Sequence, residues 1–171
     1  LQQQFESIKN DSTSIFHNVY NGVDTPVTLA NDKVSVTIST LGGRITSATL
    51  KEYKDQEGND VVLFDSKDKR KNSIKQGDNR MAYTFSFKPE YGNVCTEQCY
   101  FDVHELSTDR AVLRLDFNNN RYIDFIYELR PGSYITDLYI KAHGMGELLS
   151  SKESIDIVWK QILRQQEPGY D

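Results

Sequence analysis

Long apolar runs are missing from this chain. A helix that crosses a bilayer needs about 20 consecutive, mostly apolar residues, and no stretch of the 171 residues approaches that length. The first residues, Leu1 to Phe5, also lack the basic start and apolar centre of a secretory signal peptide. The residues alone therefore predict a soluble domain without an export signal of its own.

Proline is scarce, with 4 residues, whereas there are 10 tyrosines and 8 phenylalanines and 37% of all residues are hydrophobic. Disordered and collagen-like chains have a different composition, because they are poor in aromatic and apolar side chains. A chain of 171 residues with this composition is large enough for one domain with a real hydrophobic core.

Positive charge is in deficit, since 20 Lys and Arg stand against 25 Asp and Glu and give a net charge of −5. Nucleic-acid-binding domains carry a basic patch or stripe instead. The main basic run, residues 67–75 (KDKRKNSIK), is typical of a solvated loop. We therefore expect no nucleic acid among the partners.

Metal-binding side chains are few. The chain has two cysteines, Cys95 and Cys99, and three histidines, His17, His104 and His143. A structural zinc site needs about four ligands, usually in closely spaced pairs, and the histidines are not paired in this way. The sequence predicts neither a metal site nor another cofactor.

Strand patterns are abundant. Val34, Val36 and Ile38 alternate with polar residues, which indicates a strand with one buried face. Gly42-Gly43 then ends the run, because a glycine pair adopts backbone angles that other residues avoid. Further β-rich runs recur along the chain; they cover residues 45–50, 61–64, 81–88, 111–117, 122–129, 134–144 and 155–159.

Turn residues separate these runs. Asn118-Asn119-Asn120 suits a tight hairpin, because asparagine tolerates a left-handed backbone. Pro131-Gly132 favours a type II turn, in which Pro fixes the first central angle and Gly accepts the positive second one. Residues 1–25 show little periodicity, and we expect a short helix or a frayed tail followed by a linker that ends at Pro26.

The last apolar segment, residues 155–159, alternates and is interpreted as a strand, with a helix to Arg164 as the alternative. Trp159, the sole tryptophan, shares the alternation of Ile155 and Ile157 and is expected in the core. The whole chain is predicted to be all-β and antiparallel, with one apolar and one polar face per strand. This pattern agrees with a β-sandwich but does not by itself exclude a barrel.

Three segments carry a family resemblance. Residues 31–65 combine a strand, the turn GGR, a strand that ends in LKEY, and an apolar run that closes on LFD. Residues 129–134 read LRPGSY, and Trp159-Lys160-Gln161 is followed by Gln166-Glu167. In this order and spacing the segments resemble the N-terminal part of the large periplasmic domain of bacterial YidC-type membrane protein insertases.

The resemblance implies a β-supersandwich, two large antiparallel sheets packed face to face as in galactose-mutarotase-like folds, here in truncated form. It also implies a division of the chain. Residues 1–25 would form a leader after a transmembrane helix outside this sequence, and residues 26–171 would form the N-terminal part of the periplasmic β-sandwich domain. The chain is then expected on the periplasmic side of the bacterial inner membrane.

An oxidising periplasm favours a disulfide between Cys95 and Cys99. A spacer of this length permits a disulfide only in a turn, and Tyr91-Gly92-Asn93 just upstream makes such a turn available. The alternative is that one or both residues are small side chains at the start of a strand, with free thiols.

The resemblance further implies a non-catalytic role in the insertion and folding of inner-membrane proteins. In that family the insertion groove lies in the transmembrane bundle, so this domain is expected to contribute contacts. The implied partners are the Sec translocon or its accessory subunits, nascent membrane proteins and the membrane-embedded remainder of the parent chain.

No catalytic residue is predicted. His104 and Glu105 are neighbours on a strand and therefore point to opposite faces, while His143 lies at a strand end and His17 in the leader. A mutarotase-like set of converging histidines and a glutamate is missing.

The rival hypothesis is a carbohydrate-binding or mutarotase-like module. A sugar site needs exposed aromatic rings beside carboxylates or amides on one face. Tyr122, Asp124, Asp137 and Tyr139 are the residues of this chain that would form it.

Overall fold

The computed structural model describes residues 2–66, 79–151 and 154–162. Within these residues the chain begins with the helices α1 (Gln2–Asn10) and α2 (His17–Tyr20) and continues almost entirely as strands. The strands are β1 (Val27–Ala30), β2 (Val34–Ser39), β3 (Arg44–Lys54), β4 (Asp60–Asp65), β5 (Arg80–Ser86), β6 (Asn93–Cys95), β7 (Asp102–Leu106), β8 (Arg110–Asp116), β9 (Tyr122–Leu129), β10 (Thr136–His143) and β11 (Ile155–Lys160). Single 3-10 turns, η1 (Thr96–Gln98) and η2 (Met145–Glu147), complete the described elements.

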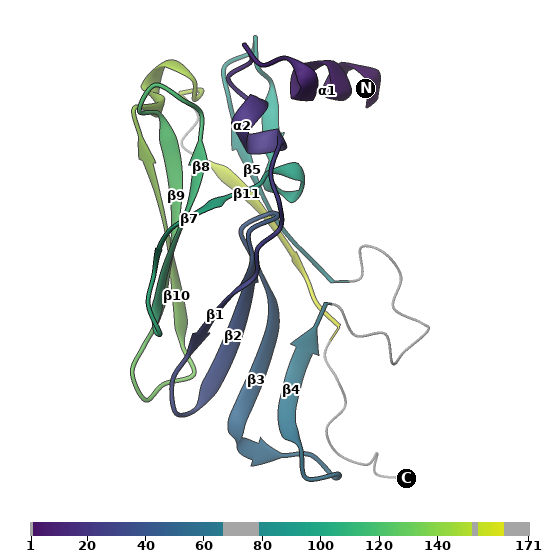
Figure 1. The fold of residues 1–171 in the computed structure, drawn as a ribbon, viewed down its shortest axis with the longest axis vertical. Coiled ribbons are helices and arrows are strands. Elements are labelled where there is room, and N and C mark those ends of the chain that lie inside the picture. Colours follow the sequence, from purple (N-terminus) through teal and green to yellow (C-terminus); the bar gives the residue numbers. More distant parts are fainter. Residues whose placement is uncertain (1, 67–78, 152–153, 163–171) are drawn as a thin grey trace.

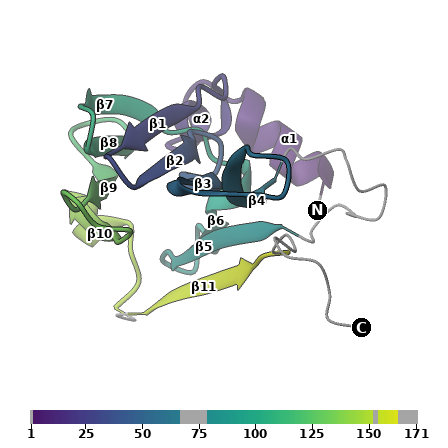
Figure 2. The same ribbon diagram turned by 90° about the horizontal axis from the view of Figure 1, so that it is seen from below.

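The strands form three antiparallel sheets. Their orders are β1-β2-β3-β4, β10-β9-β8-β7 and β11-β5-β6. The first and second sheets run side by side along the molecule (Figure 1). Figure 2 shows the first sheet lying over β5 and β11, with the second sheet closing one side. The prediction of an all-β antiparallel sandwich is confirmed.

The core lies where the inner faces of the three sheets meet. Phe125 of β9 is fully buried, and its ring centroid is 4.9 Å from that of Tyr83 on β5 and 4.8 Å from that of Phe101. Val36 and Ile38 contribute the inner face of the first sheet, as their alternation predicts. Contacts between non-consecutive strands therefore join all three sheets into one hydrophobic cluster.

The Gly42-Gly43 turn connects β2 to β3 at this meeting point. Both glycines have positive φ, +88° and +59°. The Gly42 N–H donates to the Cys99 carbonyl at 2.8 Å, and the Gly43 carbonyl accepts the Tyr127 hydroxyl at 2.6 Å. A Cβ on Gly43 would lie 2.7 Å from Cζ of Phe101, so this position requires glycine for both its backbone angle and its space.

The two other predicted turns are formed by the expected residues. Asn118, Asn119 and Asn120 all have left-handed backbones, with φ between 53° and 65°. Gly132 has φ +62°, and the Ser133 N–H donates to the Arg130 carbonyl at 3.2 Å across Pro131-Gly132.

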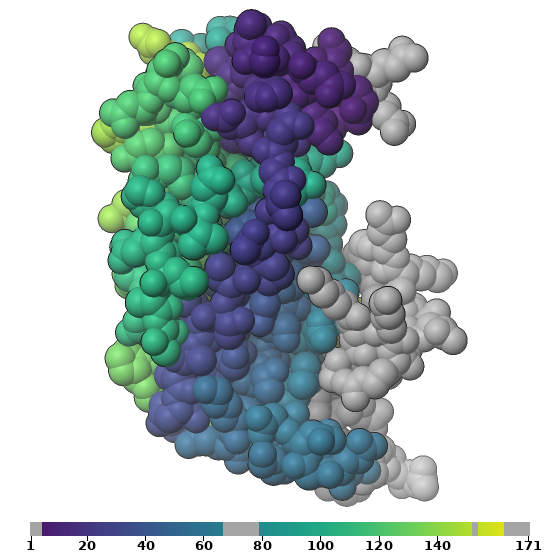
Figure 3. Space-filling view, in the orientation of Figure 1, coloured from purple at the N-terminus to yellow at the C-terminus, as the bar shows by residue number. Residues whose placement is uncertain are grey.

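The N-terminal segment packs on one end of the molecule, which it covers in Figure 3. Phe16 and Val19 are buried, and the Phe16 ring lies 5.7 Å from that of Phe87 and 6.1 Å from that of Phe117. Two residues of the leader thus belong to the core. The domain boundary at residue 26 stays a prediction.

The prediction for Trp159 is wrong. Residues 155–160 do form a strand, β11, but the Trp159 side chain is 68% exposed and Ile157 is 60% exposed. In the antiparallel register Ile157 lies opposite Tyr83, so this face of β11 continues the core-facing side of β5. The described chain places no layer over that extension, and alternation alone does not reveal such a gap.

Gly43→Ala is expected to lower the free energy of unfolding by about 2–3 kcal/mol, because it adds backbone strain and a clash with Phe101. Gly58→Ala is the matched control. Gly58 has φ +82° but no atom within 4 Å of the added Cβ, so it carries only the backbone cost, about 1 kcal/mol. Chemical denaturation of both variants checks this, and equal losses of stability would show that the packing at Gly43 is irrelevant.

Candidate functional site

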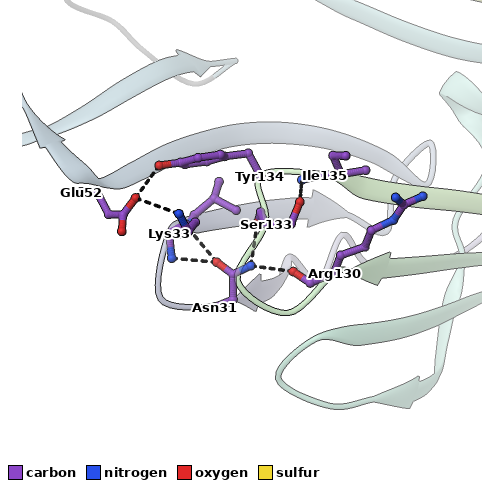
Figure 4. A network of polar contacts seen from close by, with 8 residues as sticks. Asn31, Lys33, Glu52, Arg130, Ser133, Tyr134 and Ile135 are labelled. Atoms are coloured by element: carbon purple, nitrogen blue, oxygen red, sulfur yellow. Dashed lines mark hydrogen bonds and ion pairs between the residues drawn. The ribbon is translucent and has the colours of Figure 1, made fainter.

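Two of the segments that carry the family resemblance converge at one end of the molecule. Tyr53 ends the LKEY motif on β3, and Tyr134 ends the LRPGSY hairpin between β9 and β10. Their ring centroids are 6.4 Å apart. The Tyr134 hydroxyl donates to Oε2 of Glu52 at 2.5 Å (Figure 4). Residues about 80 positions apart thus form one surface site.

Asn31 fastens the hairpin to the first sheet. Its side-chain amide donates to the carbonyls of Arg130 and Ser133 at 2.9 and 2.7 Å. Its Oδ1 accepts the backbone N–H groups of Lys33 and Val34, which fixes the turn between β1 and β2 (Figure 4). One side chain therefore makes hydrogen bonds to four backbone groups, two in the hairpin and two in the β1–β2 turn.

Lys33 completes the network from the same turn. Its Nζ lies 3.4 Å from Oε2 of Glu52 and 5.2 Å from the centroid of the Tyr134 ring. The hydrogen bond from Tyr134, and then the Lys33 charge, hold the pKa of the Glu52 carboxyl below its ordinary range. The same hydrogen bond to Glu52 raises the pKa of the Tyr134 phenol.

The apolar parts of this site remain open to solvent. Tyr53 is 54% exposed, Tyr134 41% and Ile135 50%. We call these three residues the hairpin patch. The polar network fixes Tyr134, and the Tyr53 ring lies beside it, so the patch offers an aromatic and aliphatic surface of the kind found in protein interfaces.

The four residues of the rival sugar hypothesis share one face. The register of β9 and β10 places Tyr122, Asp124, Asp137 and Tyr139 on the outer side of the second sheet. Sequence reasoning therefore grouped them correctly, because side chains alternate along a strand. The two carboxylates of this set are nevertheless already paired with arginine side chains.

Each of the two carboxylates, Asp124 and Asp137, forms an ion pair with an arginine. Arg114 donates to the two oxygens of Asp124 at 2.7 and 2.9 Å, and Arg130 donates to those of Asp137 at 2.6 and 2.9 Å. The Arg114 guanidinium also lies 3.5 Å from the centroid of the Tyr122 ring. A sugar hydroxyl would have to displace these bidentate pairs, which are strong contacts of fixed geometry.

A shallow hollow of about 310 Å³ lies at one end of this face. Its charged lining includes Arg110, Glu128, Arg130 and Asp137. Asp109 also lines it, and Arg110 pairs with both Glu105 and Glu128. Both arginines of the hollow are therefore engaged by carboxylates.

The three histidines lie on different elements and do not converge on one site. His104 is on β7 and His143 on β10, at opposite edges of the second sheet, while His17 contacts the Lys9 carbonyl in the N-terminal segment. His143 stacks on Tyr122 with ring centroids 4.8 Å apart. Within the residues that the structure describes, no group of three or more His, Cys, Asp or Glu side chains is arranged to hold a metal.

Cys95 and Cys99 flank η1 and both have free thiols. The Cys99 thiol is buried and donates to the Cys95 carbonyl at 3.4 Å, whereas the Cys95 thiol faces Glu97. Burial raises the pKa of the Cys99 thiol. Their oxidation to a disulfide in the periplasm stays a prediction.

Sequence reasoning missed the network around Asn31 and the pairing of Tyr53 with Tyr134. The motifs themselves were visible, but their meeting depends on how the first and second sheets are placed. The basic run, residues 67–75, and the Gln166-Glu167 part of the third motif lie outside the described residues.

Comparison with known proteins agrees with the resemblance seen in these motifs. The chain matches the family model of the YidC periplasmic domain over residues 26–168. The chain belongs to the YidC periplasmic domain family. Among its relatives, the membrane protein insertase YidC of Phocaeicola vulgatus is 34% identical over 170 residues, which is 99% of this chain and 25% of the relative. The membrane protein insertase YidC of Bacteroides fragilis strain YCH46 is 36% identical over 171 residues, again 99% of this chain and 26% of the relative.

The chain thus spans about a quarter of the length of these relatives. No solved structure matches it. Membership of the family assigns the chain to the periplasmic side of the membrane. Among the described helices, none has the length and apolar character needed to cross a bilayer.

Tyr134→Phe is expected to move the pKa of Glu52 up toward its ordinary range, because the hydroxyl that stabilises the carboxylate is lost. A depressed carboxyl pKa contributes stability above the unfolded pKa and loses it as the pH falls through the folded pKa. The variant should therefore lose stability at neutral pH and little at strongly acidic pH. NMR titration of the Glu52 carboxyl carbon measures the shift.

Tyr139→Phe serves as the control, because Tyr139 is exposed on β10, whereas the partners of Glu52 are Tyr134 and Lys33. It should leave the Glu52 pKa close to that of the unaltered chain. An unchanged Glu52 pKa in Tyr134→Phe would contradict the network as described.

Proposed function

We propose that this chain is a non-catalytic extracytoplasmic domain of a YidC-type membrane protein insertase. Its role is to support the insertion and folding of inner-membrane proteins through contacts with partners or substrate. The supporting relatives carry the name membrane protein insertase YidC. The observation that carries the proposal furthest is the hairpin patch, where two motifs of the family resemblance meet and leave aromatic and aliphatic side chains exposed.

A contact role fits the chemistry of the described surface. Acid–base catalysis requires a titratable group poised beside a reacting atom. Here four acidic groups of the second sheet's outer face are engaged by arginines, with Glu105 and Glu128 on Arg110, Asp124 on Arg114 and Asp137 on Arg130. The hairpin patch instead has the composition of an interface, with tyrosines on a rigid support.

The proposed partners are nascent membrane proteins and the Sec translocon or its accessory subunits. Both present apolar segments or surfaces at the periplasmic side of the inner membrane. The parent chain is embedded in that membrane, which brings the domain close to these partners. The β-supersandwich architecture, and residues 1–25 as a leader that follows a membrane helix, are parts of the same proposal.

The experiment is an insertion assay with the full-length parent in membrane vesicles. The triple variant His104→Ala, Glu105→Ala, His143→Ala removes the exposed groups most capable of acid–base chemistry. Insertion of a dependent substrate should stay close to normal. Loss of a catalytic acid or base costs about 10²–10⁴-fold, so a loss of that size in a folded, abundant protein would contradict the non-catalytic role.

The hairpin patch is tested in the same vesicles by Tyr53→Ser with Ile135→Ser. These residues are exposed and lie outside the Asn31 and Glu52 hydrogen bonds, so folding should be retained. A photo-crosslinker at Arg130, beside the patch, should capture a partner from the unaltered parent and much less from the double variant. Equal crosslinking by the unaltered parent and the double variant would show that the hairpin patch does not contact the partner.

Calorimetric titration with simple sugars distinguishes the carbohydrate-binding alternative from the proposed contact role. Binding that disappears in Tyr139→Ala would favour that alternative, because Tyr139 is the exposed aromatic ring of the predicted sugar site. We expect no heat of binding, since Asp124 and Asp137 are paired with arginines.

A further inference from the structure

The segment between β6 and β7 holds both thiols of this chain, and the two lie in different environments. Cys95 ends β6 and is half-buried, whereas Cys99 follows η1 and its side chain is fully buried. Burial also raises the pKa of the Cys99 thiol. The thiolate is the nucleophile in thiol chemistry, and an external reagent must be able to reach it. Cys95 is therefore the accessible thiol, and Cys99 is closed to direct attack.

A single turn of the chain brings the two cysteines together. The Cys99 N–H donates to the Thr96 carbonyl at 2.8 Å, and the Cys99 thiol donates to the Cys95 carbonyl at 3.4 Å. The Cys99 sulfur thus already contacts the main chain of Cys95. The Cys95 thiol is directed to Glu97 instead, with its sulfur 3.6 Å from Oε2. Rotation of the Cys95 side chain about its Cα–Cβ bond, away from Glu97, would bring the two sulfurs together.

A charged pair stands beside the accessible thiol. Arg80 at the start of β5 donates to both oxygens of Glu97, at 2.7 and 2.6 Å. The contact with Glu97, and then the neighbouring Cys95, raise the pKa of the Arg80 guanidinium. Cys95 therefore lies within reach of a fixed positive charge, which offsets the carboxylate that would disfavour a thiolate. Reactive cysteines typically have partly exposed surroundings with a positive charge nearby.

We propose that Cys95 is the entry site for an oxidant that carries a disulfide, and that Cys99 resolves the mixed disulfide formed there. Family membership assigns the chain to the periplasm, a compartment where disulfides form and persist. The inference rests on this location and on the geometry around η1, and does not depend on the proposed contact role.

The chemistry is two successive exchange steps. In the first, the Cys95 thiolate attacks one sulfur of the oxidant's disulfide, so that bond breaks and one thiolate leaves. In the second, Cys99 gives up its proton to solvent and attacks the Cys95 sulfur, which releases the other thiolate. Two thiols of this chain are oxidised to one disulfide, and the oxidant is reduced to two thiols.

The bridge would close a turn that links two of the sheets. Thr96 of η1 is fully buried, and its hydroxyl accepts the Tyr83 N–H of β5 at 3.1 Å. The Cys99 carbonyl accepts the Gly42 N–H at 2.8 Å. The segment from Cys95 to Cys99 therefore connects β5 of the third sheet to the turn between β2 and β3 of the first. A disulfide across η1 would tie the ends of this connection together.

The test follows one tryptic peptide of the full-length parent. Residues 81–110 contain both cysteines, and trypsin leaves them on one peptide because Lys88 precedes Pro89. The reduced parent is incubated with oxidised glutathione in native buffer, and samples quenched with acid are analysed by mass spectrometry. Early samples should carry a glutathione adduct on Cys95 alone. Late samples should have lost two hydrogens from the peptide, with the cysteines bridged and no lasting adduct.

Two variants separate the steps. Cys99→Ser should accumulate the adduct on Cys95, because the resolving thiol is missing. Cys95→Ser should form an adduct on Cys99 at least about tenfold more slowly, with each rate divided by the rate of the same variant in denaturant, because a buried thiol reacts only through local opening.

Three results would overturn the proposal. Similar corrected rates for the two variants, or an early adduct on Cys99 of the unaltered parent, would contradict the order of attack. A lasting Cys95 adduct without a bridge in the unaltered parent would contradict the resolving role of Cys99. An unaltered parent in which neither cysteine reacts would contradict the entry site itself.

Discussion

The Tyr127 hydroxyl donates to the Gly43 carbonyl inside the core, at the point where the sheets converge. This bond joins β9 of the second sheet to the turn that ends β2 of the first. Phe101 packs against Gly43 of the same turn, and the Gly42 N–H donates a hydrogen bond to the Cys99 carbonyl. Tyr127 lies two residues before Leu129, where the LRPGSY hairpin begins, so this contact ties the start of the hairpin to the first sheet.

Rigid placement of the sheets is what creates the hairpin patch. Tyr53 belongs to the first sheet and Tyr134 to the hairpin of the second. Asn31 and Glu52 then fix the hairpin locally through two hydrogen bonds to its backbone carbonyls and one to the Tyr134 phenol, while Asn31 also fixes the turn between β1 and β2. An aromatic surface held in this way loses little conformational entropy when it binds a partner.

The sequence predicted those features that local physics determines. Strands at Val34 to Ser39 and Tyr122 to Leu129 follow from alternation, and the left-handed backbone of Asn118 to Asn120 follows from the tolerance of asparagine. Features that depend on neighbours escaped prediction. Trp159 has the alternation of a core residue, but its burial requires a layer that the described chain does not provide. The meeting of Tyr53 with Tyr134 requires the relative placement of two sheets.

The central claim is that the Tyr127–Gly43 hydrogen bond holds the sheets together, and the direct test is the stability of Tyr127→Phe. Tyr139→Phe is the control, because the Tyr139 ring lies on β10 outside the core and is 48% exposed. Chemical denaturation should show a loss of about 1–3 kcal/mol for Tyr127→Phe, which leaves the Gly43 carbonyl unsatisfied, and little change for Tyr139→Phe. Equal stability of the two variants and the unaltered chain would contradict the claim.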